Sequence, residues 1–163
     1  ECAAAWYFAT NKKDAPTALV LSRQNLPQLD GSSQEALKGG YILEDSTKDT
    51  PDAIIIATGS EVSLAVEAKK ELENIDVRVV SMPCMDLFED QPDEYKNAVL
   101  PKNVTARVGV EALSEFGWGK YIGINGEFVG MKSFGASAPG NQLFEHFGIT
   151  KDAVVAAVKK TLN

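Results

Sequence analysis

The strand–turn–helix–strand succession between residues 53 and 82 constrains the fold of this chain more than any other feature. Residues 53–58 form a short run that is apolar on both faces, as in a strand covered on both sides. Gly59 then makes a turn, and Ser60 can cap a helix that reaches about Asn74 before a second buried strand at residues 77–82. Strands joined through a helix pair in parallel with a right-handed crossover, which predicts an α/β fold.

Further elements fit around this unit. Three more strands and a short helix are expected, at residues 40–44, 105–110, 128–132 and about 92–99. Pro139 opens a helix that ends at Gly148, a glycine suited to the left-handed C-terminal position. Thr150 caps the last helix, whose inward face is expected to carry Ala153, Val154, Ala157 and Val158.

The first 36 residues have a different pattern. Residues 1–9 are typical of the end of a helix that lacks a capping residue, and residues 17–21 predict a short buried strand. Helix, turn and strand in this order form the second half of a βαβ unit, so we expect its first strand upstream of Glu1. Residues 26–37 show no sustained period, which predicts a linker and a domain boundary near residue 36.

Charge and composition exclude several classes of function. A net charge of −7 disfavours nucleic acid as a partner, because that partner requires a basic face. No apolar run approaches the ~20 residues of a membrane-spanning helix, and no signal peptide is recognisable. We therefore expect a cytoplasmic protein without a membrane partner. Cys2 and Cys84 fit no metal-binding spacing, and we interpret them as reduced, mostly buried thiols.

Arg23 is the one candidate binding residue that its position singles out. It lies just beyond the carboxyl end of the strand predicted at residues 17–21, which is the edge where open α/β sheets place their ligands. A guanidinium there can hold a phosphate through paired, charge-assisted hydrogen bonds. The alternative is an arginine that ties the linker to a carboxylate. Position alone leaves both interpretations open.

Two glycine-containing turns could bind an anion. The turn at residues 58–61 joins a strand to a helix, where free backbone N–H groups gather, but it lacks a dinucleotide or Walker pattern. A tight turn is the favoured interpretation. Residues 135–140 could cradle a phosphate, although their small side chains favour close packing of a strand against the next helix.

No catalytic residue can be identified from sequence motifs. His146 is the only histidine, and it falls in the last turn of a short helix, where an imidazole suits the carbonyl end. No nucleophile motif lies near it, and neither a reactive environment for Cys84 nor a paired set of carboxylates can be recognised. We predict neither catalytic nor metal-binding residues in this chain.

Aromatic side chains gather between residues 116 and 134. They form either core beneath the sheet edge or a subunit interface, for which a homodimer is the natural partner. The residues concerned are Phe116, Trp118, Tyr121, Phe128 and Phe134.

Four motifs in matching order carry a family resemblance. They occupy residues 21–27 (LSRQNLP), 57–62 (ATGSEV), 116–119 (FGWG) and 134–139 (FGASAP). With them, essentially the whole chain resembles the C-terminal end of transketolase. The resemblance implies a three-layer α/β sandwich with a five-stranded, mostly parallel mixed sheet whose first strand is antiparallel. Residues 1–36 resemble the end of the pyrimidine-binding domain with its linker, and residues 37–163 resemble the C-terminal domain.

The resemblance also implies a function. Transketolases are homodimeric enzymes that use thiamine diphosphate and Mg²⁺ to transfer a two-carbon ketol unit between sugar phosphates in the pentose phosphate pathway. By similarity, Arg23 matches the arginine that grips the substrate's phosphate, while the catalytic and metal-binding residues fall upstream of Glu1. We expect this chain alone to be an inactive scaffold and dimer-interface unit that binds no cofactor. The alternatives are a regulatory anion-binding module and part of another thiamine diphosphate enzyme such as dihydroxyacetone synthase.

Overall fold

The apolar run at residues 53–57 lies at the centre of a five-stranded sheet. The computed structural model describes residues 1–163, and its sheet has the order β1-β3-β2-β4-β5. Strands β2 to β5 run parallel, and β1 pairs antiparallel with β3 at one edge. The strands are β1 (Tyr41–Glu44), β2 (Ala53–Ala57), β3 (Val77–Ser81), β4 (Arg107–Glu111) and β5 (Glu127–Gly130). The five strands predicted between residues 40 and 132 are thus confirmed, with ends shifted by at most two residues.

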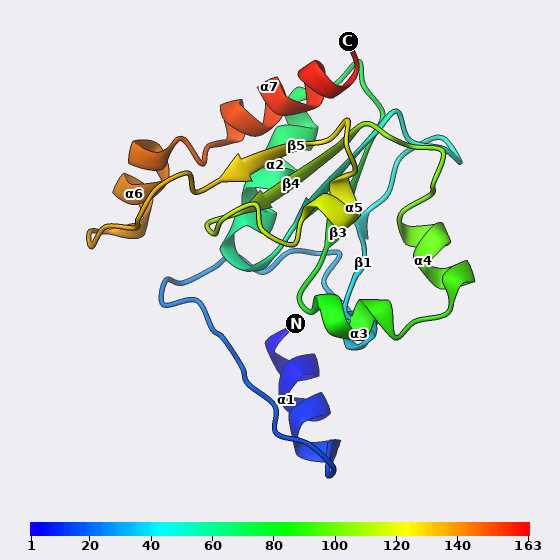
Figure 1. Ribbon diagram of the computed structural model, residues 1–163, viewed down its shortest axis with the longest axis vertical. Coiled ribbons are helices and arrows are strands. Elements are labelled where there is room, and N and C mark those ends of the chain that lie inside the picture. The colour runs from blue at the N-terminus through cyan, green and yellow to red at the C-terminus, as the bar shows by residue number, and fades with distance from the viewer.

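Helices cover both faces of the sheet, because successive side chains of a strand point to opposite sides. From β2, Ile55 packs into the cluster that includes α2 (Val62–Glu71) and α7 (Lys151–Thr161). Its neighbours Ile54 and Ile56 pack into a second cluster with side chains of the short helices. Those helices are α3 (Met85–Glu89), α4 (Asp93–Val99) and α5 (Gly119–Ile122). Figure 1 shows the resulting three layers, which confirm the predicted fold class.

The crossover from β2 to β3 differs from the prediction at its start. A 3₁₀ turn, η2 (Gly59–Glu61), comes first, and α2 begins only at Val62. Ser60 does not cap α2, because its hydroxyl donates to the Glu61 carboxylate at 2.5 Å. The positive φ of Gly59, 57°, allows the sharp turn out of β2.

The two C-terminal helices begin and end as the sequence indicates. Helix α6 (Gly140–Phe147) follows Pro139 and ends at Gly148, which adopts the left-handed conformation with φ 68°. The Thr150 hydroxyl accepts a hydrogen bond from the Ala153 backbone N–H at 3.2 Å and so caps α7. Three of the four residues expected on the inward face of α7 are buried, and the fourth, Ala153, is half-buried.

The N-terminal segment departs most from expectation. Helix α1 (Cys2–Asn11) forms, but residues 17–21 are an extended stretch without strand pairing, and the Val20 side chain is 96% exposed. That strand prediction is wrong for this structure, because a strand needs a neighbouring edge and none is paired with it. The expected linker contains a 3₁₀ turn, η1 (Gln34–Lys38). In Figure 1, α1 and the following stretch stand apart from the layers.

The two cysteines are not alike. Both are free thiols, but Cys2 on α1 is exposed and Cys84 before α3 is half-buried. The expectation of mostly buried thiols is therefore wrong for Cys2, because α1 has no covering layer. No helix combines the length and apolar character needed to cross a membrane.

Candidate functional site

Arg23 lies at a bend in an irregular segment that passes the carboxyl edge of the sheet. The neighbouring Ser22 hydroxyl is 3.9 Å from where a Cβ would stand on Gly59, at the end of β2. On its other side, Gln24 Nε2 is 3.9 Å from the same position on Gly140, at the start of α6. Although residues 17–21 form no strand, the two neighbours of Arg23 thus lie beside an edge where α/β sheets place ligands.

The Arg23 side chain is exposed and forms no ion pair. The alternative in which it ties the linker to a carboxylate is therefore not found in this structure. An exposed guanidinium without a partner keeps its fork of N–H donors available for a planar or tetrahedral anion.

Two carboxyl groups occupy the same edge between β2 and β4. Glu61 is only 5% exposed, and burial raises its pKa above the ordinary range, with Glu111 adding to the rise. Glu61 Oε2 accepts a hydrogen bond from the Ala112 backbone N–H at 3.4 Å, so Glu61 links the ends of the two strands. Glu111 in turn accepts a hydrogen bond from Trp118 Nε1 at 2.7 Å.

These acidic groups bear on the proposed anion site at residues 58–61. The carboxyl of Glu61 accepts the hydrogen bond of the Ser60 hydroxyl, which is one of the donors that an anion at this turn would need. The geometry therefore favours the tight turn over an anion-binding loop. The sequence showed only a glutamate in a first helical turn, and its link to β4 depends on a contact 51 residues away that no local pattern reveals.

The loop at residues 135–140 differs from its prediction. Every residue from 133 to 140 is exposed, and a Cβ added to Gly135 would meet nothing within 4 Å. Close packing is therefore not the reason for these small residues, and that expectation is wrong.

The aromatic group divides between the two interpretations that the sequence left open. Trp118 and Tyr121 are buried and Phe128 is partly buried against them, so they are core beneath the sheet edge. Phe116 and Phe134 are 95% and 98% exposed on the loops after β4 and β5. The exposed pair therefore does not belong to the core.

His146 lies in the last turn of α6, as predicted, with its ring against Phe147 at a centroid separation of 4.8 Å. No cluster of three or more His, Cys, Asp or Glu side chains has the arrangement of a metal site.

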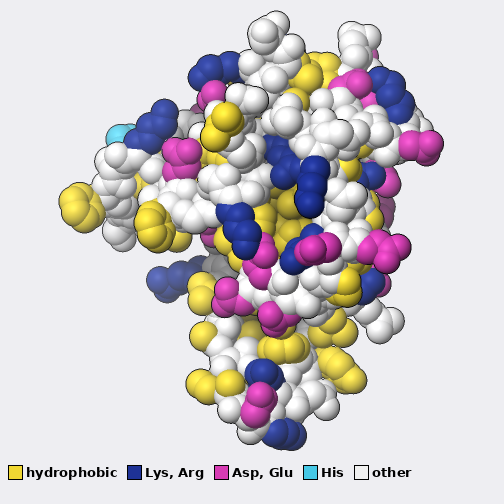
Figure 2. Space-filling model, turned by 45° about the vertical axis from the view of Figure 1, so that its right-hand side comes forward, with side chains coloured by type: hydrophobic (Ala, Val, Ile, Leu, Met, Phe, Trp, Pro, Cys, Tyr) yellow, Lys and Arg dark blue, Asp and Glu magenta, His cyan; other side chains and the backbone are white.

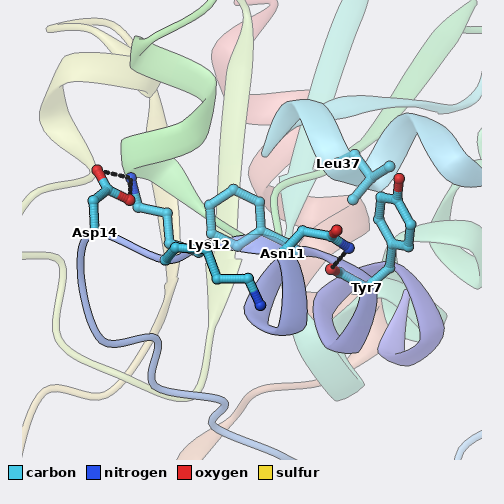
Figure 3. Close-up of a pocket in the computed structure, with 7 residues that line it drawn as sticks. Tyr7, Asn11, Lys12, Asp14 and Leu37 are labelled. Atoms are coloured by element: carbon cyan, nitrogen blue, oxygen red, sulfur yellow. Dashed lines mark hydrogen bonds and ion pairs between the residues drawn. The ribbon is translucent and has the colours of Figure 1, made fainter.

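A cavity of about 370 Å³ lies between α1 and η1. Figure 3 shows Tyr7 of α1 beside Leu37 of η1, and at the other side the ion pair of Lys12 and Asp14, 3.2 Å apart. Asn11 donates back to the Tyr7 carbonyl at 2.8 Å. Because these polar groups are satisfied within the segment, the cavity is a crevice beside a loosely covered helix.

Comparison with known proteins identifies relatives over nearly the whole chain. The family model described as Transketolase-like TK C-terminal domain matches residues 39–150. Transketolase from Bacillus subtilis is 54% identical over 169 residues, which cover 100% of this chain and 25% of the relative. The chain therefore spans about a quarter of the length of the curated relatives that it matches.

Solved structures agree. A transketolase from Leishmania mexicana superposes with a TM-score of 0.88 at 46% identity, covering 98% of this chain and 24% of that one. A split-gene transketolase described as an inactive β4 tetramer has a TM-score of 0.64 at 26% identity, covering 86% of this chain and 48% of that one.

Proposed function

We propose that this chain, which belongs to the transketolase family, is the C-terminal part of an enzyme. That enzyme would transfer a two-carbon ketol unit between sugar phosphates. Such an enzyme would depend on thiamine diphosphate and serve the pentose phosphate pathway in the cytoplasm. The match to the family's C-terminal domain over residues 39–150 supports this proposal.

We assign residues 1–36 to the end of the pyrimidine-binding domain with its linker, and residues 37–163 to the C-terminal domain. The match to the family model begins at residue 39, close to this division. The apolar side chains of α1 and of residues 17–21 also support it, because they are exposed here and would be covered by the remainder of a domain.

Arg23 is proposed to bind the phosphate of the sugar substrate. The observation that carries this role is an exposed guanidinium without an ion pair, at the carboxyl edge of the sheet, in a chain related to transketolases. The phosphate lies far from the reacting carbon of the sugar. By holding it, Arg23 would position the substrate. Arg23 would act by positioning and not as a catalytic residue.

The test is Arg23→Ala in the full-length enzyme. We expect KM for phosphorylated substrates to rise about 10- to 100-fold, the effect of losing hydrogen bonds to a charged group. KM for unphosphorylated substrates should change little, and Lys132→Ala, which removes another exposed cation, should leave both unchanged. Equal effects of Arg23→Ala on both substrate classes would contradict the assignment.

Thiamine diphosphate and Mg²⁺ are proposed to bind outside this chain, and the isolated chain is proposed to be inactive. The absence of an assembled metal site among its residues motivates this proposal. Incubating the purified chain with both cofactors and a ketose phosphate tests it. Turnover above the protein-free rate would overturn it.

The structural role proposed for residues 37–163 is that of a scaffold that contributes to a homodimer. Phe116 and Phe134 support it, because both are exposed on loops that follow the adjacent strands β4 and β5, and aromatic side chains are enriched at interfaces between copies. Phe116→Ser with Phe134→Ser should weaken dimerisation of the full-length enzyme in sedimentation experiments. Unchanged dimer stability would contradict this role.

Two other functions remain distinguishable by experiment. A regulatory anion-binding module at residues 58–61 would show saturable binding of phosphates or nucleotides that Ser60→Ala reduces, whereas the carboxyl of Glu61 disfavours it. Another thiamine diphosphate enzyme, such as dihydroxyacetone synthase, would differ in the acceptor aldehyde of the full-length protein.

A further inference from the structure

A basic hollow of about 260 Å³ lies beside the short helices, on the face of the sheet opposite α2 and α7. Among the side chains that line it are four basic ones, Lys96, Lys102, Arg107 and Lys120, and two acidic ones, Glu89 and Asp93. The hollow therefore carries two more positive than negative charges, in a chain whose net charge is −7. Figure 2, which brings the α4 side forward, shows Lys and Arg side chains around a hollowed apolar floor.

Arg107, at the start of β4, is the least compensated of these charges. It is half-buried and has no carboxylate within ion-pair distance. Its guanidinium donates instead to the backbone carbonyls of Leu100, Pro101, Val104 and Tyr121 at 2.7–3.2 Å. Neutral carbonyls fix its position but leave its charge in place, and at least one of its five N–H groups has no partner.

Lys102 adds a second uncompensated charge at the exposed rim of the hollow, because it forms no ion pair. The two acidic groups are already engaged by the other lysines. Lys120 lies 2.6 Å from the Glu89 carboxylate, and Lys96 lies 3.1 Å from that of Asp93. An incoming anion would therefore meet Arg107 and Lys102 as free positive charges, with Lys120 able to reorient toward it.

We propose that this basic hollow binds a small phosphate-bearing anion at a site separate from Arg23. A phosphate carries close to two negative charges at neutral pH and offers several oxygens, which suits a fixed guanidinium beside flexible ammonium groups. Phe88, Leu100 and Tyr121 also line the hollow, beside Asn97, and their carbon atoms can contact a short carbon chain. The volume restricts the ligand to inorganic phosphate or a small phosphate monoester.

The same hydrogen bonds give Arg107 a structural role, because its guanidinium satisfies carbonyl groups at the end of α4 and of α5. A substitution at Arg107 would therefore disturb both the fold and the site. Lys102 and Lys120 are exposed and avoid this difficulty. They are the positions at which binding can be changed without loss of folding.

The test uses the purified chain carrying Arg23→Gln, which removes the other proposed phosphate site. Inorganic phosphate and glycerol 3-phosphate are titrated by calorimetry and by ¹⁵N chemical-shift changes. We expect saturable binding with shifts centred on residues 100–107 and 119–121. Lys102→Ala with Lys120→Ala should raise Kd at least about tenfold, the effect of losing charge-assisted contacts.

The matched control is Lys132→Ala with Lys159→Ala, which removes two exposed lysines away from the hollow. It should change Kd less than twofold, and near-native circular dichroism of each variant checks folding. Non-saturable binding, or equal weakening by both pairs of substitutions, would overturn the proposal. The Arg23 assignment would be unaffected by that result, because this site does not depend on it.

Discussion

Residues 1–35 and residues 36–163 differ sharply in how far they bury their side chains. All 39 buried residues lie at or after Ala36, although α1 and residues 17–21 are as apolar as many elements of the sheet. Trp6 and Tyr7 are 57% and 62% exposed, whereas Trp118 and Tyr121 are 1% and 6% exposed. Apolar composition alone therefore does not produce a core, because each element also needs a covering layer.

A substitution in each region should give the largest contrast. Ile55→Ala removes a fully buried side chain between helices and sheet and should lower the free energy of unfolding by about 2–5 kcal/mol. Val20→Ala, at a side chain that is 96% exposed, should change it by less than about 0.5 kcal/mol. Urea denaturation of both variants measures the difference. Similar losses would show that residues 17–21 are covered in solution.

A smaller effect is expected where the two regions are tied together. The Glu1 carboxylate accepts hydrogen bonds from Tyr41 Oη at 2.7 Å and from Ser81 Oγ at 2.5 Å. Glu1→Ala leaves these two buried donors without that acceptor, which should cost about 1–3 kcal/mol. Hydrogen exchange should show faster exchange in α1 and unchanged exchange in β2. Glu35→Ala is the control, and unchanged protection of α1 would contradict the tie.

The stability of residues 36–163 should also depend on alkaline pH, because this region contains partly buried tyrosines. Burial, with the nearby Glu35 charge, raises the pKa of Tyr95 to about 12. The unfolded chain loses this proton near pH 10, while the folded chain holds it. The contribution to stability is therefore complete below pH 10 and is lost as pH rises from about 10 to about 12. Tyr95→Phe should reduce this loss in urea denaturation at pH 9 and 11, and an unchanged pH dependence would contradict the shift.

The smallest expected contrast between the two regions is in the reactivity of their cysteine thiols. Cys2 on α1 is exposed and Cys84 is half-buried, so a thiol reagent should modify Cys2 first. Mass spectrometry of the partly modified chain, with Cys2→Ser and Cys84→Ser as references, measures the order. Faster modification of Cys84 would mean that α1 is covered in solution or that Cys84 is activated.

The sheet was predictable from sequence for a local reason. Residues 53–57 and 77–81 are short apolar runs joined through a helix, and that pattern determines both their burial and their parallel pairing. The one-turn helices α3 and α5 were missed, because four or five residues are too few to display a helical period. The strand expected at residues 17–21 failed because its formation depends on a partner edge.

The candidate sites were less predictable. The place of Arg23 after an apolar run singles it out in the sequence, but the approach of its neighbours Ser22 and Gln24 to Gly59 and Gly140 depends on the tertiary fold. The basic hollow was not recognised, since Lys96, Arg107 and Lys120 come together only when α4, β4 and α5 pack. Local sequence patterns can therefore indicate a single residue such as Arg23, whereas a cluster such as the basic hollow is visible only in the tertiary structure.

The distribution of the two tryptophans gives this chain a built-in spectroscopic probe of each region. Trp6 reports from solvent on α1, and Trp118 reports from the interior, where its indole N–H is bound to Glu111. Covering α1 with another polypeptide should shift Trp6 emission to shorter wavelength without altering Trp118. Intrinsic fluorescence of Trp6→Phe and Trp118→Phe variants would therefore follow assembly and unfolding as separate signals.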